Sequence, residues 1–287
     1  MFSFHAVDYN ASGAKKNFVE SIKQTGFAVL KNHPIDLSLI EQSFSDWKNF
    51  FQLSEEEKKS FLFKRNFEDV QCGFFPASTS ETAKGFTAKD LKEFYHYYPS
   101  SPRALPDCIG PSTKKLRDQL IIVGKILLSW LEEALPQSHK DKLSQALTDM
   151  VDEKKQTLLR VLHYPPLAED SMEGAVRAAP HEDINLITLL VAATAPGLQL
   201  QKANGEWLDV PCEPDTICVN VGDMLQECSN FYYKATTHQV LNPNGKDRFL
   251  SRYSIPLFLH CKPGAVLSER YTAKSYLEER LGELGVL

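Results

Sequence analysis

The sequence predicts an α+β protein with a double-stranded β-helix (jelly-roll) core flanked by helices. Before Lys155 the apolar residues recur mainly at helical spacing, whereas after it they gather in short runs rich in β-branched and aromatic side chains. No Pro-, Gly- or Ser-rich linker separates the two parts. We therefore expect a single domain over residues 1–287, with a mainly helical N-terminal part (1–155), a jelly-roll core (156–262) and a C-terminal helix (263–287).

Helical signals follow one another through the first part of the chain. A helix over residues 17–24 precedes Gly26 and a short strand at 27–30. Apolar residues spaced i, i+4, i+7 and i+11 in "DLSLIEQSFSDWKNFF" indicate a helix packed on the core, and Ser54 with Glu57 forms a capping box that begins the next helix. The remaining predictions are a long amphipathic helix from Pro111 to about Leu135 and a further helix with Leu143, Leu147 and Met150 facing inward.

Short strands are expected throughout the second part. The candidate runs are "TLLRVLHY", "INLITLLVA", "GLQLQ", "EWLDV", "TICVNVG", "THQVL" and "SRYSIPLFL". Turn signals such as "APG", "ANG" and "NPNG" separate them. Short strands at this spacing favour an antiparallel sandwich or barrel, which is the basis of the jelly-roll prediction.

The composition excludes several classes of protein. Hydrophobic residues make up 43% of the 287 residues, enough for a sizeable core. A net charge of −5 argues against a nucleic-acid surface, and the longest apolar stretch, "LIIVGKILLSWL", is too short to cross a membrane. "MFSFHAVDYN" lacks the features of a signal peptide, and the six cysteines show no CxxC spacing. We expect a soluble, cytoplasmic protein that binds neither nucleic acid nor membrane, and its oligomeric state stays open.

Polar residues at the start of "HEDINLITLL" stand before a buried strand, where they are costly without partners. In extended backbone, His181 and Asp183 point to the same side and Glu182 points away. His238, in a later strand, would complete a set of two histidines and one carboxylate. This set suits a non-haem Fe(II) site, and a catalytic zinc site can use the same ligands.

A second pair of polar residues favours iron. Arg252 and Ser254 share one side of the strand "SRYSIPLF", where a buried guanidinium is costly unless it binds an anion. A small dicarboxylate that also chelates the metal would supply that anion, because guanidinium groups bind carboxylates with two hydrogen bonds. Tyr164, at the end of "RVLHYPP", could donate to the same ligand from a neighbouring strand.

The order H-x-D, a distant His and then R-x-S resembles that of the 2-oxoglutarate- and Fe(II)-dependent dioxygenases, in the branch that includes isopenicillin N synthase. The resemblance extends over nearly the whole chain, through "GFAVLKNHPID", "FFQLSEEEKKSF", "DLKEFY", "GLQLQKANGEWLDV" and "VNVGDMLQECSN". It is strongest in "THQVLNPNGKDRFLSRYSIPLFLH".

The resemblance implies a role for each site residue. His181, Asp183 and His238 would be the catalytic iron ligands. Arg252 and Ser254 would bind the distal carboxylate of the cosubstrate 2-oxoglutarate, together with Tyr164, which matches the tyrosine of an N-x-Y motif whose Asn position is here Leu162. Ile184 and Asn185 stand where relatives often carry Phe-Gly, so they are expected to shape the substrate pocket.

The implied activity is an oxygenase that hydroxylates, desaturates or cyclises a small organic substrate with O2 and releases succinate and CO2. Two alternatives remain open at this point. One is an iron-dependent oxidase of the isopenicillin N synthase type, which uses no 2-oxoglutarate. The other is a non-catalytic jelly roll that binds a metal and a metabolite.

Overall fold

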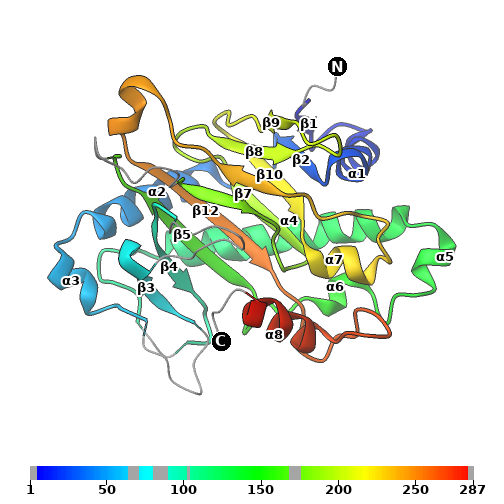
Figure 1. Ribbon diagram of the computed structural model, residues 1–287. Helices are drawn as coiled ribbons and strands as arrows, with labels where there is room; N and C mark the ends of the chain where they lie inside the picture. Colours follow the sequence, from blue (N-terminus) through cyan, green and yellow to red (C-terminus); the bar gives the residue numbers. More distant parts are fainter. Residues whose placement is uncertain (1–4, 64–70, 80–89, 102–103, 168–175, 284–287) are drawn as a thin grey trace.

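Two β-sheets form the centre of the molecule (Figure 1). The structure is a computed structural model that describes residues 5–63, 71–79, 90–101, 104–167 and 176–283. In this part of the chain the larger sheet has eight strands, in the order β1 (Val7–Asp8), β2 (Phe27–Lys31), β10 (Thr216–Val221), β7 (Ile187–Val191), β12 (Arg252–Leu259), β5 (Leu158–Tyr164), β4 (Glu93–Tyr97) and β3 (Gly73–Phe75). The smaller sheet has four, in the order β6 (Ala178–His181), β11 (His238–Val240), β8 (Leu198–Gln201) and β9 (Trp207–Asp209).

The predicted jelly-roll core is confirmed. Strands β5 to β12 come from the second part of the chain, and their paired neighbours run antiparallel. Each of the expected strand runs forms a strand, and β6 is an additional one. The sequence of β6 gave no strand signal because "AAPH" has no β-branched or aromatic residue of the strand-forming kind and contains a proline.

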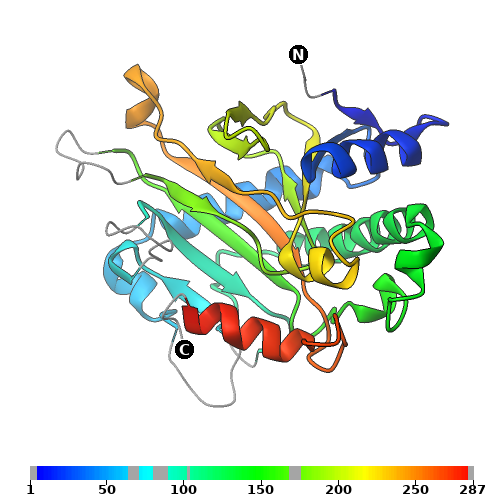
Figure 2. The same ribbon diagram turned by 45° about the vertical axis from the view of Figure 1, so that its right-hand side comes forward.

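Helices cover the outer face of the larger sheet (Figures 1 and 2). They include α1 (Ala14–Thr25), α2 (Leu37–Phe51) and α4 (Ser112–Ala134), and α4 crosses strands β7 and β12. Gly124 permits this close approach, because a Cβ atom there would lie 2.3 Å from Cδ1 of Leu259. The predicted capping box is present: Ser54 and Glu57 begin the short helix α3 (Glu55–Lys59).

The first part of the chain contains more strand than its periodicity predicts. Besides the expected strand β2, it supplies β1, β3 and β4 to the larger sheet. The predicted helix after α4 is also interrupted: it consists of α5 (Gln137–Lys140) and α6 (Leu147–Met150). Leu147 and Met150 are buried as expected, since one helical turn already brings residues i and i+3 to one side. Strand β3 lies in the segment 71–90, whose small and turn residues predict a loop instead, and residues 80–89 of that segment lie outside the described part.

The remaining elements are short or lie at the end of the chain. They are the 3₁₀ turns η1 (Ala77–Thr79) and η2 (Gly245–Phe249), the helix α7 (Asp223–Cys228) and the helix α8 (Ala273–Glu283). Helix α8 starts ten residues later than the 263–287 segment predicted for the C-terminal helix, and residues 284–287 lie outside the described part. No helix in the described ranges combines the length and the apolar character needed to cross a membrane.

The larger sheet has two different faces, because side chains alternate along each strand. In β7, Ile187, Leu189 and Val191 are fully buried in the main core on the side of α4. The intervening Thr188 and Leu190 line a cavity between the two sheets. The same alternation in β5, β10 and β12 brings several polar or charged residues to the cavity, and this face carries the candidate site.

Candidate metal centre and cosubstrate site

Strand pairing brings the three predicted metal ligands together. His181 ends β6 and lies directly opposite His238 on the neighbouring strand β11. Asp183 follows two residues after His181, and its Oδ1 lies 4.0 Å from Nε2 of His181 and 3.8 Å from Nε2 of His238. The two imidazole rings have centroids 4.4 Å apart. One ligand atom of each residue therefore faces the same point, and all three atoms lie within 4.8 Å of one another.

Backbone carbonyls fix the tautomer of both histidines. Nδ1 of His181 lies 2.8 Å from the carbonyl oxygen of Ala179, and Nδ1 of His238 lies 3.0 Å from that of Thr236. A carbonyl only accepts, so each Nδ1 carries the proton and donates it. Each Nε2 is then left with the lone pair that a metal needs.

Two donors orient the carboxylate. The hydroxyl of Thr188 donates to Oδ2 of Asp183 at 2.6 Å, and the amide of Asn220 donates to the same oxygen at 2.7 Å. Oδ1, the oxygen that faces the histidines, is left for the metal. The Nδ2 group of Asn185 in turn donates to the hydroxyl of Thr188 at 3.0 Å, which extends the chain of hydrogen bonds one residue further.

The electrostatic surroundings favour the protonation states that bind a cation. Desolvation in the folded protein, followed by the nearby His238 and Lys92, outweighs the opposing Asp183 carboxylate and lowers the pKa of His181 to about 4 in total. Burial opposes ionisation of Asp183, but the adjacent imidazoles and the donors Thr188 and Asn220 hold the pKa of Asp183 below its usual value. Neutral imidazole and ionised carboxylate are the forms that coordinate metals.

The donor set fits a divalent transition metal. Metal bonds to such ligands are roughly 2.0–2.2 Å long, so two neighbouring ligand atoms on one side of an octahedral ion lie about 3 Å apart. The separations of 3.8 and 4.0 Å are longer than this, so the side chains would move together by about 1 Å on binding an ion. Two histidines and one carboxylate on one side of the ion leave other coordination positions open, which is the arrangement of non-haem Fe(II) oxygenases.

The cavity beside the triad encloses about 560 Å³, including space open to solvent. Arg252 and Ser254 line it from β12, and Tyr164 lines it from β5, directly opposite Arg252 in the strand pairing. Nε of Arg252 donates to the carbonyl oxygen of Ala195 at 2.9 Å. Its Nη1 is buried and has no hydrogen-bond partner among the described residues. An unpaired buried guanidinium nitrogen next to a metal site is suited to an anionic ligand.

Tyr164 lies close to two positively charged side chains. The guanidinium carbon of Arg252 lies 5.0 Å from the centre of the Tyr164 ring, and that of Arg177 lies 5.9 Å from it. Burial and the neighbouring charge of Arg252 both lower the pKa of Arg177. Two guanidinium groups around one aromatic ring make this end of the cavity strongly positive.

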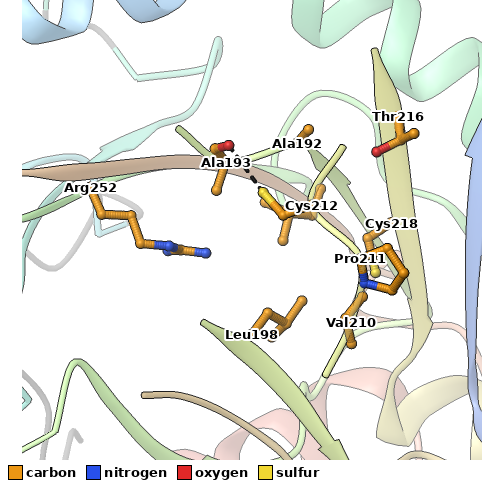
Figure 3. A pocket seen from close by; sticks show the side chains of 10 residues that line it. Ala192, Ala193, Leu198, Val210, Pro211, Cys212, Thr216, Cys218 and Arg252 are labelled. Carbon is orange, nitrogen blue, oxygen red and sulfur yellow. Dashed lines mark hydrogen bonds between the residues drawn. The ribbon is translucent and has the colours of Figure 1, made fainter. Parts of the chain in front are cut away.

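A smaller pocket of about 290 Å³ adjoins this end of the cavity (Figure 3). Leu190, Leu198 and Arg252 line both spaces. The sulfur of Cys212 lies on the other side of the smaller pocket, where it donates to the carbonyl oxygen of Ala193. The pocket is otherwise mainly apolar.

The structure does not bring Ile184 and Asn185 to the larger cavity. The loop from Asp183 to Asn185 lies on the first turn of α7, where the carbonyl of Asp183 accepts from Asp223 and that of Asn185 accepts from Met224. This anchoring turns Ile184 into the main core and leaves Asn185 fully buried against Gly222. Asn185 contributes to the hydrogen-bond chain behind Asp183 instead of to the cavity wall.

Sequence reasoning also missed four polar residues of the cavity: Lys92, Arg160, Thr188 and Asn220. A signal was present for three of them. Arg160, Thr188 and Asn220 are polar residues inside apolar runs, at the alternate positions that face the cavity. Lys92 could not be placed in the same way, because its position depends on the pairing of β4 with β5.

Comparisons with known proteins identify the family of the chain. The sequence pattern of the 2OG-Fe(II) oxygenase superfamily matches residues 155–261, and that described as "non-haem dioxygenase in morphine synthesis N-terminal" matches residues 7–117. A 2-oxoglutarate-Fe(II) type oxidoreductase of Aspergillus fumigatus is 30% identical over 276 residues, which cover 89% of this chain and 80% of that protein.

Solved structures show the same fold. A crystal structure from Shewanella oneidensis, of a protein described as an oxygenase, has 47% sequence identity, covers both chains completely and superposes with a TM-score of 0.87. A full-length Neurospora crassa protein, crystallised in complex with alpha-KG, shares 23% identity and superposes with a TM-score of 0.78 over 97% of this chain and 95% of its own.

The fold and the three converging ligands define a non-haem iron oxygenase of the jelly-roll class. The chain belongs to the 2OG-Fe(II) oxygenase superfamily. The protein is therefore an oxidoreductase that uses Fe(II) as cofactor and 2-oxoglutarate as cosubstrate, which confirms the activity and cofactors expected from the sequence.

Proposed function

We propose that the enzyme oxidises a C–H bond of a small organic substrate, with His181, Asp183 and His238 as the iron ligands. The observation that carries this proposal is the convergence of two Nε2 atoms and one carboxylate oxygen on one point. The hydrogen bonds of both Nδ1 groups and of Oδ2 support it, because they orient each ligand before the metal binds.

Arg252 is the proposed ligand of the distal carboxylate of 2-oxoglutarate, with Ser254 and Tyr164 beside it. Its buried Nη1 supports this role, since a carboxylate would supply the missing partner. The anchored Nε fixes the orientation of the guanidinium, so 2-oxoglutarate would extend from Arg252 toward the triad along the cavity face of β12.

Bound Fe(II) and 2-oxoglutarate supply the chemistry: O2 is reduced while the oxoacid loses CO2, one oxygen atom enters succinate and the other enters the substrate C–H bond as a hydroxyl group. The protein contributes placement. Arg252 and Ser254 hold the cosubstrate, the hydrogen-bonded Asp183 keeps one carboxylate oxygen toward the metal, and the apolar side chains Leu162, Leu198 and Phe258 exclude water from the cavity. Hydroxylation is the proposed outcome, and desaturation or cyclisation would require only a differently held substrate.

An anaerobic titration tests the proposal. The Fe(II)-loaded protein is titrated with 2-oxoglutarate, and a visible charge-transfer band is expected. Arg252→Gln should require on the order of 100-fold more 2-oxoglutarate, because it loses a buried charge-assisted pair. The exposed Arg270 supplies a matched control, and Arg270→Gln should titrate as the wild type does. A wild-type protein that gives no band would contradict the assigned cosubstrate site and favour the oxidase alternative.

The non-catalytic alternative has a separate test. A protein that binds Fe(II) and 2-oxoglutarate but never releases succinate with any substrate would be a binding module.

We also propose a cytoplasmic location. The six free thiols support it, because reducing compartments keep cysteines unpaired.

A further inference from the structure

Arg177 is a second buried guanidinium near the cosubstrate end of the cavity. It directly precedes β6, and it is 1% exposed, whereas Arg252 is 2% exposed. The guanidinium carbons of Arg177 and Arg252 lie 5.9 Å and 5.0 Å, respectively, from the centre of the Tyr164 ring. These two distances add to 10.9 Å, which is the largest separation that the two guanidinium carbons can have. Both positive charges therefore act on the same small region of the protein.

The hydrogen bonds of Arg177 do not account for its charge. Its Nη2 donates to the carbonyl oxygen of Leu250 at 3.0 Å, which ties the start of β6 to the segment before β12. Its buried Nε has no hydrogen-bond partner among the described residues. A neutral amide group could also donate to a carbonyl, so the bond to Leu250 gives no reason for a buried cation at this position.

The two charges are unfavourable to each other in the absence of an anion. Burial, and then the charge of Arg252, lower the pKa of Arg177. In the part of the chain that the structure describes, neither guanidinium forms an ion pair with a carboxylate. Lys92 differs in this respect, because Oδ2 of Asp90 lies 2.8 Å from its Nζ and balances its charge. The arginine pair therefore carries an uncompensated positive charge, which a bound anion would offset.

We propose that Arg177 makes the enzyme selective for a dianionic oxoacid as cosubstrate, by adding its charge to that of Arg252 at the distal carboxylate. This inference rests on the proposed role of Arg252 as the ligand of that carboxylate. Arg177 acts at a distance and needs no contact with the cosubstrate. Two charges roughly 10 Å apart inside a protein still change a binding constant on the order of 10-fold. An oxoacid without the distal carboxylate would lose this contribution.

Two oxoacids that differ only at the distal end test the inference. 2-Oxovalerate has the carbon chain and the oxoacid end of 2-oxoglutarate, but a methyl group replaces the distal carboxylate. Each compound is titrated anaerobically into the Fe(II)-loaded wild type, Arg177→Gln, Arg177→Met and the control Arg270→Gln, and the charge-transfer band gives the dissociation constants. The selectivity is the dissociation constant of 2-oxovalerate divided by that of 2-oxoglutarate.

The neutral variants should lose selectivity. Arg177→Gln and Arg177→Met should lower it on the order of 10-fold, because both remove the charge, although only glutamine keeps a donor for Leu250. Either variant alone decides the comparison if the other does not fold. Arg270→Gln removes an equal charge from an exposed position, and its selectivity should match that of the wild type.

A purely structural role of Arg177 would give a different result. A distorted site would weaken the binding of both oxoacids by similar factors and leave the selectivity unchanged, and this outcome would overturn the inference. A loss of selectivity in Arg177→Met but not in Arg177→Gln would also overturn it, since the hydrogen bond to Leu250 would then be responsible instead of the charge. A wild type that forms no band with 2-oxoglutarate would instead refute the proposed function.

Discussion

The two faces of the larger sheet are built from the same strands yet differ in almost every property. Toward α4, the strands present fully buried aliphatic side chains such as Leu189, Ile255 and Leu257. Toward the cavity, the same strands present Thr188, Ser254 and other polar or charged groups. Because side chains alternate along a strand, neighbouring residues contribute either to the core or to the cavity. Substitutions toward α4 should therefore lower the free energy of unfolding, and substitutions toward the cavity should lower activity or ligand affinity.

The largest effect is expected at Asp183, the proposed metal ligand beside both histidines. Asp183→Ala should reduce metal-dependent turnover by roughly 10³-fold or more, because the metal loses its only anionic protein ligand in the triad. Succinate formation measures this. Glu182→Ala is the matched control, since this exposed carboxylate is adjacent in sequence and bonds to Thr237 instead. Equal losses of turnover in Asp183→Ala and Glu182→Ala would contradict the role of Asp183 as a metal ligand.

The opposite face should show the reverse pattern. Leu257→Ala removes a fully buried side chain that contributes to the core on the α4 side, which should lower the free energy of unfolding by about 2–5 kcal/mol. The folded Leu257→Ala variant should bind 2-oxoglutarate with the affinity of the wild type. Chemical denaturation and the anaerobic titration measure the two quantities. A large change in cosubstrate affinity would show that the two faces are coupled.

Groups that orient a ligand without touching the metal should have an intermediate effect. Thr188→Val preserves shape but removes the donor to Oδ2 of Asp183, so metal affinity should fall by roughly 10- to 100-fold. Thr157→Val is the control, because the buried hydroxyl of Thr157 makes no hydrogen bond among the described residues and lies outside the cavity. Equilibrium metal titration compares them, and equal affinities would exclude a positioning role for Thr188.

The smallest effect concerns acid stability. Burial lowers the pKa of His260, two residues after Phe258, to about 4, whereas a histidine in an unfolded chain titrates near 6.5. Between these values the unfolded chain binds a proton that the folded chain does not, so the contribution to stability is lost as pH falls from about 6.5 toward 4. Without metal, Tm should fall between pH 7 and pH 5 by about 2 °C less in His260→Gln than in the wild type. If Tm depends on pH in the same way in the wild type and in His260→Gln, the lowered pKa of His260 is contradicted.

Most strands of the core and the residues of the triad could be predicted from local patterns and motif order, whereas the meeting of His181 with His238 depends on the pairing of β6 with β11. Alternation in "SRYSIPLF" placed Arg252 and Ser254 on one side, and both line the cavity. Pairings between distant segments could not be predicted in the same way. β4 has an aromatic-rich sequence, but its position beside β5, and hence that of Lys92, is fixed only in the folded sheet.

The environment of the loop after Asp183 was equally inaccessible to a local pattern. Asn185 was expected at the substrate pocket because Ile184 and Asn185 stand where enzymes of the resembling family often carry Phe-Gly. Hydrogen bonds to α7, about forty residues further along the chain, decide that it faces the other way. The single-domain organisation of the chain stays a prediction, and so does the role of each site residue, which the experiments above address.

Arg252 has a guanidinium that borders two spaces at once, and this arrangement has a pharmacological consequence. A compound bound among Val210, Pro211 and Cys212 would contact Arg252, the proposed ligand of 2-oxoglutarate, from the smaller pocket and without any group that chelates iron. Inhibitors of that design would compete with 2-oxoglutarate yet derive their selectivity from an apolar recess rather than from the metal, which is common to every enzyme of the superfamily.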